Sequence, residues 1–411
     1  MKQIKLLFIL ILLFPSCKKK AVVLDYCMPD NLEVQTLPVT IDNEKYLLYS
    51  NLYSKVDYIK LEATDQSLVG EVSKLLIMDN GDLIVLDSKR VSVIRFDRNG
   101  KYICSMGRSG KGHGEYITAT DVVYDKYNKC VIVLDEGGGK LITYDMNGKY
   151  LSTTQMGCCP SAFAVLDKNY LCLYMNHFDN LGSHPVGHNF KIINRKGYVV
   201  SEFMEFDSRM GSFHPACDYT FFSIDSKTCF MQPFSSLIYL VDNSIAGAPT
   251  ITPELYIDFG EKKIPQEWYQ GNSWDLTDKL RDSDGITYLE SIYKIRNRLF
   301  LNLLMNNNMY LYILNPQDRS SDKTYFDSYN DMYGLVSSIF ITTINRNKCY
   351  YVIEPSEFNS YKELIDEGYN ICTIDKNGKE KVYLPSQKDI ELLNSIQDGD
   401  NPIIQVCTLK D

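Results

Sequence analysis

The sequence predicts an all-β fold, a six-bladed β-propeller with four-stranded antiparallel blades, and three observations lead to this prediction. First, a segment that begins at Ile84 returns 48 residues later at Ile132, so that "IVLDSKRVSVIRFDRNGKY" corresponds to "IVLDEGGGKLITYDMNGKY". Second, the apolar runs are short and bounded by turn residues, as strands are, and lack a helical period. Third, a repeat of about 48 residues accommodates four strands and is typical of propeller blades.

Six turn positions mark the repeating units. Each carries an aspartate or asparagine directly after an apolar residue: Asp97, Asp145, Asn194, Asp242, Asn315 and Asp375. Asp and Asn side chains bond nearby backbone groups and tolerate turn dihedrals, so each position predicts a strand that runs into a hairpin. An earlier strand-like run precedes every turn: "DLIVLD", "CVIVLD", "YLCLYM", "TCFMQP", "LFLNLL" and "CYYVIE". Six such units in a ring bury a continuous core and leave only short strand edges.

The uneven spacing of the later units predicts insertions. Residues 261–286, between the fourth and fifth units, are polar and partly helical in pattern, and they contain both tryptophans of the chain. Near the C-terminus, "SQKDIELLNSIQDGD" predicts a short helix with Ser386 as its N-cap. Strand patterns flank the repeats, "DYIKLE" from Asp57 and "NPIIQVCTLK" at the end, and the propeller is expected to span residues 56–411. We expect these strands to fasten the ring, and the sequence leaves open which one completes the last blade.

The first residues of the chain predict an export signal followed by a lipid anchor. Two lysines precede an apolar run, Leu6–Phe14, which is too short to cross a bilayer as a mature helix but suits a secretory signal. A small residue followed by Cys17 resembles the bacterial lipoprotein signal, in which the cysteine is lipidated. We therefore expect a signal peptide over residues 1–16 and a lipidated segment over 17–55. The alternative is an ordinary signal peptide that contains a cysteine.

Charge and targeting together narrow the location and the partners. The net charge of −9 argues against a nucleic-acid surface, which needs clustered Lys and Arg. Acyl chains would hold the protein on a membrane, and we expect this to be the outer membrane of a bacterial envelope. The residues after Cys17 are Lys18, Lys19 and Lys20, and they lack the acidic residues that are sometimes found after the cysteine in surface-exposed lipoproteins. This favours the periplasmic face over the cell surface.

The run "YIKLE…SLVGEVSKLL…GDLIVLD…VIRFDRNGKYICSMGRSGKGHGEY", with "NPIIQVCTLK" at the end, resembles the six-bladed β-propeller lipoproteins of the NHL-like type. The resemblance covers nearly all of the mature chain. In that family the loop after the first full unit commonly reads G-x-G-P-G-E-Y. Gly110, Gly112, Gly114, Glu115 and Tyr116 match this pattern, and His113 replaces the proline. The resemblance implies the fold and the location more than it implies any chemistry.

The same loop, "GRSGKGHGEY", raises the question of a phosphate-binding site. A phosphate-binding loop places Gly-Lys-Ser/Thr at the start of a helix. Here Lys111 is followed by Gly112, and the next segment, "ITATDVVYD", is strand-like. We therefore expect a tight crossing between two blades, in which glycines supply backbone freedom, and we predict no nucleotide or other cofactor.

Three aromatic residues of the insertion are the candidate ligand-binding residues. Trp268, Tyr269 and Trp274 have flat apolar faces with polar edges, which suit a glycan, a peptide or an envelope protein partner. The alternative is that these rings pin the insertion onto the propeller. No metal site is predicted, because Pro185 and Gly187 interrupt the cluster of His177, His184 and His188, and a regular helix there is disfavoured.

The lack of a complete catalytic motif favours a binding or scaffold protein. No G-x-S-x-G elbow is present, and no catalytic residue is identified. The alternative is a propeller enzyme, either a metal-dependent lyase or a glycoside-active protein, with residues that converge in the central funnel. Some NHL-like propellers are lyases with histidines in the channel, and the five histidines of this chain match that arrangement poorly.

Overall fold

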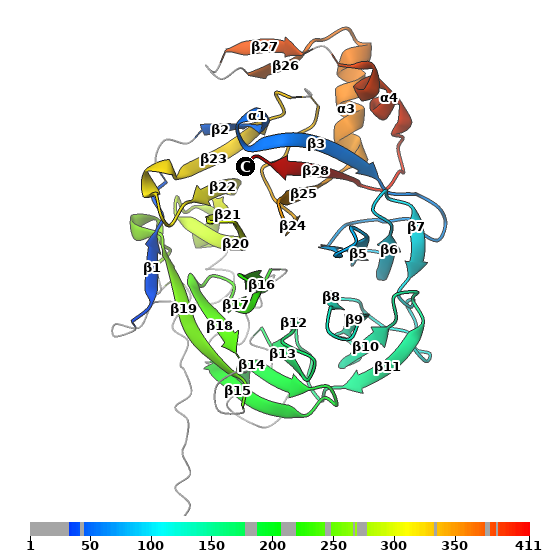
Figure 1. Cartoon of the computed structure of the whole chain (residues 1–411), viewed down its shortest axis with the longest axis vertical. Coiled ribbons are helices and arrows are strands. Elements are labelled where there is room, and N and C mark those ends of the chain that lie inside the picture. Colours follow the sequence, from blue (N-terminus) through cyan, green and yellow to red (C-terminus); the bar gives the residue numbers. More distant parts are fainter. Residues whose placement is uncertain are drawn as a thin grey trace, which may run out of the picture.

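The structure, a computed structural model, describes residues 33–41, 45–176, 187–206, 219–242, 248–265, 268, 278–332, 335–374, 379–383 and 385–411. These residues form six antiparallel blades arranged in a ring, which Figure 1 shows along the ring axis. The prediction of an all-β, six-bladed propeller with four-stranded blades is therefore confirmed.

In blades 1 to 3, successive strands pair in chain order from the ring axis outward (Figure 1). Blade 1 contains β4 (Lys74–Ile77), β5 (Leu83–Asp87), β6 (Ser92–Phe96) and β7 (Tyr102–Ser105). Blade 2 contains β8 (Asp121–Asp125), β9 (Cys130–Asp135), β10 (Lys140–Tyr144) and β11 (Tyr150–Gln155). Blade 3 contains β12 (Ala162–Val165), β13 (Tyr170–Tyr174), β14 (Gly187–Asn194) and β15 (Val199–Phe206).

In blades 4 to 6, the chain termini add strands from outside the repeat. Blade 4 contains β16 (Phe221–Ile224), β17 (Lys227–Met231), β18 (Leu237–Asp242) and β19 (Thr250–Asp258), and β1 (Gln35–Pro38) pairs parallel to β19. Blade 5 contains β20 (Ile286–Ile295), β21 (Arg298–Met305), β22 (Asn308–Leu314) and β23 (Lys323–Tyr329), and β2 (Lys45–Leu48) pairs parallel to β23. Blade 6 contains β24 (Thr343–Asn345), β25 (Lys348–Ile353), β28 (Ile403–Leu409) and β3 (Tyr53–Lys60). We call β1, β2 and β3 the N-terminal strap.

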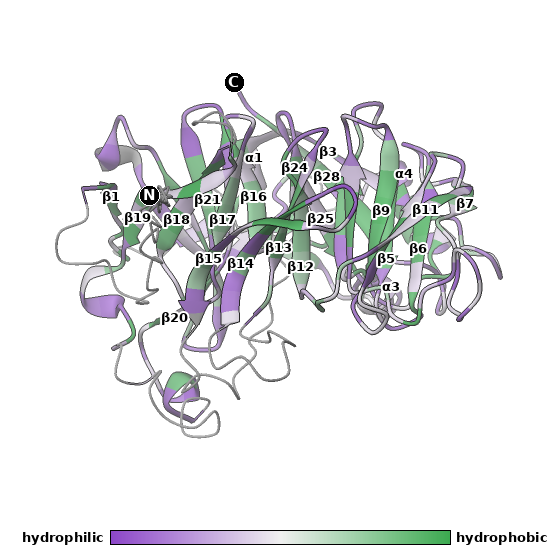
Figure 2. Ribbon diagram, turned by 90° about the horizontal axis from the view of Figure 1, so that it is seen from below, coloured by the Kyte–Doolittle hydropathy of each residue, from purple (hydrophilic) through white to green (hydrophobic). Residues whose placement is uncertain are grey.

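The apolar core lies between neighbouring blades. Six buried clusters are present, and each joins the facing sides of two adjacent blades, including blades 6 and 1. The strand β9, for example, is buried at every position, because Val131 and Val133 face blade 1 while Ile132 and Leu134 face blade 3. A single blade therefore cannot bury both of its own faces, and the ring is the unit of stability. Figure 2 shows the apolar strands inside this ring.

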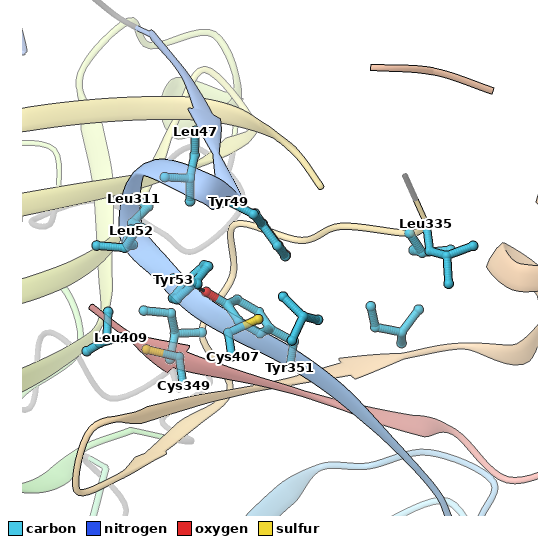
Figure 3. Packing of buried hydrophobic residues seen from close by; sticks show 14 of the residues in the cluster. Leu47, Tyr49, Leu52, Tyr53, Leu311, Leu335, Cys349, Tyr351, Cys407 and Leu409 are labelled. Carbon is cyan, nitrogen blue, oxygen red and sulfur yellow. Dashed lines mark hydrogen bonds between the residues drawn. The ribbon is translucent and has the colours of Figure 1, made fainter. Parts of the chain in front are cut away.

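Both termini close the ring in blade 6. The C-terminal strand β28 lies between β25 and β3, and Figure 1 shows β28 beside β3 at the top of the ring. At the axis, the Asn345 side chain donates to the Met78 carbonyl at 3.2 Å, which links blade 6 to blade 1. Figure 3 shows the buried cluster beneath the closure, where the Tyr53 and Tyr351 hydroxyls share a hydrogen bond. The terminal strands expected to fasten the ring thus both complete the last blade.

Four of the six predicted turns form as expected at the outer hairpins, and the residues that follow Asp242 lie outside the described part of the chain. The side-chain oxygens of Asp97, Asp145 and Asn194 each accept backbone N–H groups two and four residues later, at 2.8 to 3.1 Å. The oxygen of Asn315 accepts the N–H groups of the residues two and three positions later. These bonds satisfy the turn backbone and fix where the third strand ends in blades 1, 2, 3 and 5.

The sixth unit read from the sequence is wrong in detail, although the number of blades is right. Residues Ile371–Ile374 form β26, which pairs only with β27 (Glu380–Tyr383) in a separate hairpin outside blade 6, and Asp375 lies outside the described residues. This hairpin belongs to an excursion with α3 (Pro355–Asp366) and α4 (Gln387–Ser395), and the third strand of blade 6 is β28. The expected N-cap of α4 is present, because the Ser386 hydroxyl accepts the Asp389 N–H at 3.3 Å.

Short helical turns lie in a few of the other connections. The helix α1 (Tyr49–Leu52) joins β2 to β3, and the 3-10 turn η4 (Arg319–Ser321) joins β22 to β23. In the predicted insertion over 261–286, the described part contains the turn η2 (Gly260–Lys262) and a helical turn at residues 278–281. The partly helical character expected of this insertion is therefore present in its described residues.

Candidate functional site

The blade topology assigns the connections to two faces of the ring. Because strands alternate in direction, the first-to-second and third-to-fourth hairpins of every blade lie on one side, which we call the turn face. The second-to-third connections and the crossings to the next blade lie on the other side, the loop face. By this topology the long connections from β7 to β8, from β19 to β20 and from β25 to β28 all belong to the loop face. Long loops on a rigid scaffold are the usual place for variable binding surfaces.

The glycine-rich crossing on this face is closed by its own residues. The carboxylate of Glu115 accepts the Gly112 N–H at 2.7 Å and the Arg108 Nε at 2.6 Å. A Cβ at Gly110 would lie 2.1 Å from that carboxylate, so a larger residue there would displace the Glu115 side chain from its present position. The buried Tyr144 anchors the loop by donating its hydroxyl to the Gly114 carbonyl at 2.9 Å. The loop therefore crosses from blade 1 to blade 2 as predicted, and its backbone N–H group at Gly112 already has an anionic partner.

A cavity of about 290 Å³ lies along the ring axis among the innermost strands β4, β8, β12 and β16. Its apolar wall consists mainly of half-buried side chains from these four strands: Leu76, Val123, Tyr124, Val165, Phe221 and Phe222. Two lysines, Lys74 and Lys126, and the exposed Ser223 add polar groups to the wall. We call this cavity the axial channel. Aromatic faces beside a few donors are typical of small-ligand sites.

One ion pair organises the channel wall across three blades. Lys74 of β4 donates to the Asp121 carboxylate of β8 at 2.6 Å, and this carboxylate also accepts the Phe163 N–H of β12 at 3.0 Å. The Asp121 side chain is almost fully buried, so both of its oxygens serve the scaffold. Lys126, in the turn after β8, is exposed and lies 5.3 Å from the centre of the Tyr127 ring. No ion pair of Lys126 is present among the described residues.

The buried aspartates at the ends of the second strands are structural residues that the sequence analysis did not identify. Asp135 accepts the N–H groups of Ile117 and Thr118 at 3.0 Å, and it lies 3.4 Å from Lys140 Nζ. Burial by itself would raise the pKa of Asp135, but the two backbone donors, the Thr118 hydroxyl and Lys140 outweigh it and lower the pKa. Asp87 has the same role in blade 1, where it accepts the Gly70 N–H. The 48-residue offset that joins Asp87 to Asp135 was the available signal.

The residues chosen from the sequence lie mostly beyond the described part of the chain. Cys17, Tyr269 and Trp274 are outside the described residues, as are His177 and His184. Trp268 is half-buried at the start of the insertion, where its N–H donates to the Pro265 carbonyl at 3.1 Å. Trp268 does not line the axial channel, so the structure does not bring it together with the aromatic wall described above. Within the described residues, no group of three or more His, Cys, Asp or Glu side chains is placed to hold a metal ion.

Residues 32–408 match the family described as domain of unknown function DUF4934. The chain belongs to this family. The sequence of this DUF4934 protein matches no curated protein at a significant level. In the described ranges, no helix has both the length and the apolar character needed to cross a membrane.

Solved structures support the fold of this DUF4934 protein. A candidate exported protein from Bacteroides fragilis is 18% identical, with a TM-score of 0.70, and the match covers 92% of this chain and all of the other. Virginiamycin B lyase from Staphylococcus aureus is 11% identical with a TM-score of 0.41, over 86% of this chain and 99% of the lyase. A DUF4221 family member from Bacteroides vulgatus is 10% identical with a TM-score of 0.41, over 87% and 97% of the two chains. At these identities the first match shows the shared fold.

Proposed function

We propose that the protein is a lipid-anchored binding protein of the bacterial envelope, and that it holds a small ligand in the axial channel. The observation that carries this proposal is the wall that blades 1 to 4 build together, with Tyr124, Phe221 and Phe222 half-buried around an open volume of about 290 Å³. Partly exposed aromatic faces stack on sugar rings or on apolar side chains of a peptide. This surface supports binding, whereas the aromatic residues predicted in the insertion contribute only Trp268 to the described structure.

The polar groups of the channel favour a ligand with an acidic group. The positive charge of Lys74 is balanced by Asp121, but Lys126 has no such partner among the described residues. The nearby buried carboxylates of Asp121 and Asp135 accept backbone N–H groups of neighbouring strands and loops. Because these acids hold the scaffold together, they are poorly suited to act as a general acid and base. We therefore favour a glycan or peptide ligand with an anionic group over a substrate that is converted.

Calorimetric titration of the purified protein with neutral and acidic oligosaccharides and short peptides tests this proposal. We expect Phe222→Leu to weaken every ligand that binds, and Lys126→Gln to weaken only acidic ligands, by about tenfold. Lys168→Gln is the matched control, because Lys168 lies in the equivalent turn of blade 3 and is exposed, but does not line the channel. The proposal is wrong if no ligand of the set binds, or if both channel variants bind like the control.

The lipid anchor is a separate part of the proposal. It rests on the sequence signal at Cys17, and β1 begins only at Gln35, which leaves a long segment between the anchor and the ring. We expect Cys17→Ala to move the protein from the membrane fraction to the soluble fraction of the cell. Cys27→Ala, in the same N-terminal segment, is the control and should remain with the membranes. Membrane association of the Cys17→Ala protein would contradict the anchor.

A further inference from the structure

A second cavity, of about 520 Å³, lies between the N-terminal strap and the outer hairpin of blade 5. Pro38 ends β1, Thr40 follows it, and Lys45 begins β2. The other lining residues come from β22, η4, β23 and the residue between η4 and β23. Figure 1 shows this hairpin beside the N-terminal strands at the rim of the ring. The cavity shares no lining residue with the axial channel, so any site here is independent of the function proposed above.

The charges that line this cavity are mainly positive. Lys45, Arg319 and Lys323 contribute three cations, and Asp322 is the one carboxylate among the described lining residues. The carboxylate of Asp322 is already engaged: one oxygen accepts the Asn315 N–H at 2.8 Å, and the other accepts Arg319 Nε at 2.7 Å. Lys45 and Lys323 are exposed and form no ion pair among the described residues. In a chain whose net charge is −9, this concentration of cations favours an anionic ligand.

A buried hydroxyl gives a second, independent indication of a ligand. Thr324 lines the cavity, the residue is 1% exposed, and its hydroxyl has no hydrogen-bond partner among the described residues. A buried polar group without a partner is unfavourable, and in native structures it calls for an unseen water, ion or ligand. A bound oxyanion would accept from this hydroxyl.

The arrangement of donors selects the kind of anion. Arg319 is held in place through Nε to Asp322 and through Nη2 to the Pro38 carbonyl, so its paired donors do not form a free fork. A free fork is what recognises a planar carboxylate in bidentate fashion. The ammonium groups of Lys45 and Lys323 act instead as point charges, which suit a tetrahedral oxyanion. We propose that this cavity binds a sulfate or phosphate group, free or as a monoester on a small molecule.

Titration with inorganic sulfate, inorganic phosphate and acetate at low ionic strength tests the site. We expect sulfate or phosphate to bind more tightly than acetate to the purified full-length protein. Lys45→Gln combined with Lys323→Gln should weaken oxyanion binding by about tenfold or more. The matched control is Lys149→Gln combined with Lys196→Gln, which changes the same charge at exposed positions in the outer hairpins of blades 2 and 3. No binding by either oxyanion, or equal losses in the two double variants, would overturn the proposal.

Thr324→Val separates a ligand-binding role from a structural one. The substitution keeps the shape of the side chain and removes the hydroxyl. Because the hydroxyl has no partner in the part of the chain that the structure describes, the midpoint of thermal unfolding should stay the same or rise. Oxyanion binding should nevertheless weaken by about tenfold. A lower unfolding midpoint with unchanged oxyanion binding would show that the hydroxyl serves the fold, and it would remove this residue's support for the site.

Discussion

The substitution Gly148→Ala tests how tightly the blades approach one another. Gly148 lies in the outer hairpin of blade 2 with φ of +79°, and a Cβ there would lie 2.3 Å from the Ser105 carbonyl oxygen of β7 in blade 1. Gly100 and Gly197 make the same approach, with 2.2 Å to the Lys60 and Gln155 oxygens of the preceding blades. The glycine of these turns therefore serves both the turn and the interface between blades.

The expected loss of stability has two parts. An alanine with positive φ costs about 1 to 2 kcal/mol, and relief of the overlap with Ser105 costs about 1 to 3 kcal/mol more. Gly157→Ala supplies the first part alone, because Gly157 has φ of +68° and nothing lies within 4 Å of its would-be Cβ. In equilibrium urea unfolding followed by circular dichroism, Gly148→Ala should thus lose about 1 to 3 kcal/mol more than Gly157→Ala. Equal losses would refute the close approach as the reason for glycine.

Three further perturbations test other parts of the scaffold. Burial raises the pKa of Tyr53, Tyr293 and Tyr351 well above the ordinary value, so these phenols ionise in the unfolded chain at a lower pH than in the folded protein. Their contribution to the free energy of unfolding is therefore fully present below about pH 10. Above that pH, the free energy of unfolding should fall by about 1.4 kcal/mol per pH unit for each phenol. Urea midpoints unchanged between pH 9 and 11 would contradict this burial. Asp135→Asn should lower the free energy of unfolding at neutral pH by about 1 to 3 kcal/mol. Because the pKa of Asp135 is lowered in the folded protein, the wild type loses stability as the pH falls below about 4, and the variant should lose less. The same loss of stability at acid pH in both proteins would contradict this role of Asp135. Ser386→Ala should cost about 1 kcal/mol and increase hydrogen exchange only in α4, and exchange that spreads into blade 6 would show that the excursion and the ring unfold together.

The repeat could be predicted from the sequence wherever its information is local. Asp97, Asp145 and Asn194 bond their own turns, so the same residue types recur at the same spacing whatever the neighbouring blade is. The prediction of the sixth unit was wrong because it, too, rested on a local pattern. Ile371–Ile374 with the following turn has the local pattern of a blade hairpin, but its partner is β27 alone. Long-range packing decides which strands pair. In blade 6 the strand that pairs with β25 is β28, not β26.

The axial channel could not be predicted residue by residue. Its wall takes Leu76, Tyr124 and Phe222 from three different blades, and each of these residues looks like an ordinary strand residue in its own segment. Only the ring brings the inner strands together. The insertion with the two tryptophans can be recognised in the sequence because it interrupts the repeat. The channel residues belong to the repeat, so nothing in the sequence distinguishes them from other strand residues. For a propeller, an interruption in the pattern indicates a loop on the rim or on the loop face, and the axis has to be reconstructed from aligned first strands.

Closure of the ring connects the N-terminal strap to both candidate sites. β3 lies early in the chain and pairs with β28, the last strand, with Tyr53 opposite Leu409, so blade 6 forms only when the chain is present as far as β28. The earlier blades depend on local hairpins, but each leaves an apolar face that only its neighbours cover. The strap also supplies Lys45 to the cavity at blade 5, and the axial channel requires the inner strands to be held in register. We therefore expect both candidate sites to be complete only after β3 and β28 have paired and closed the ring.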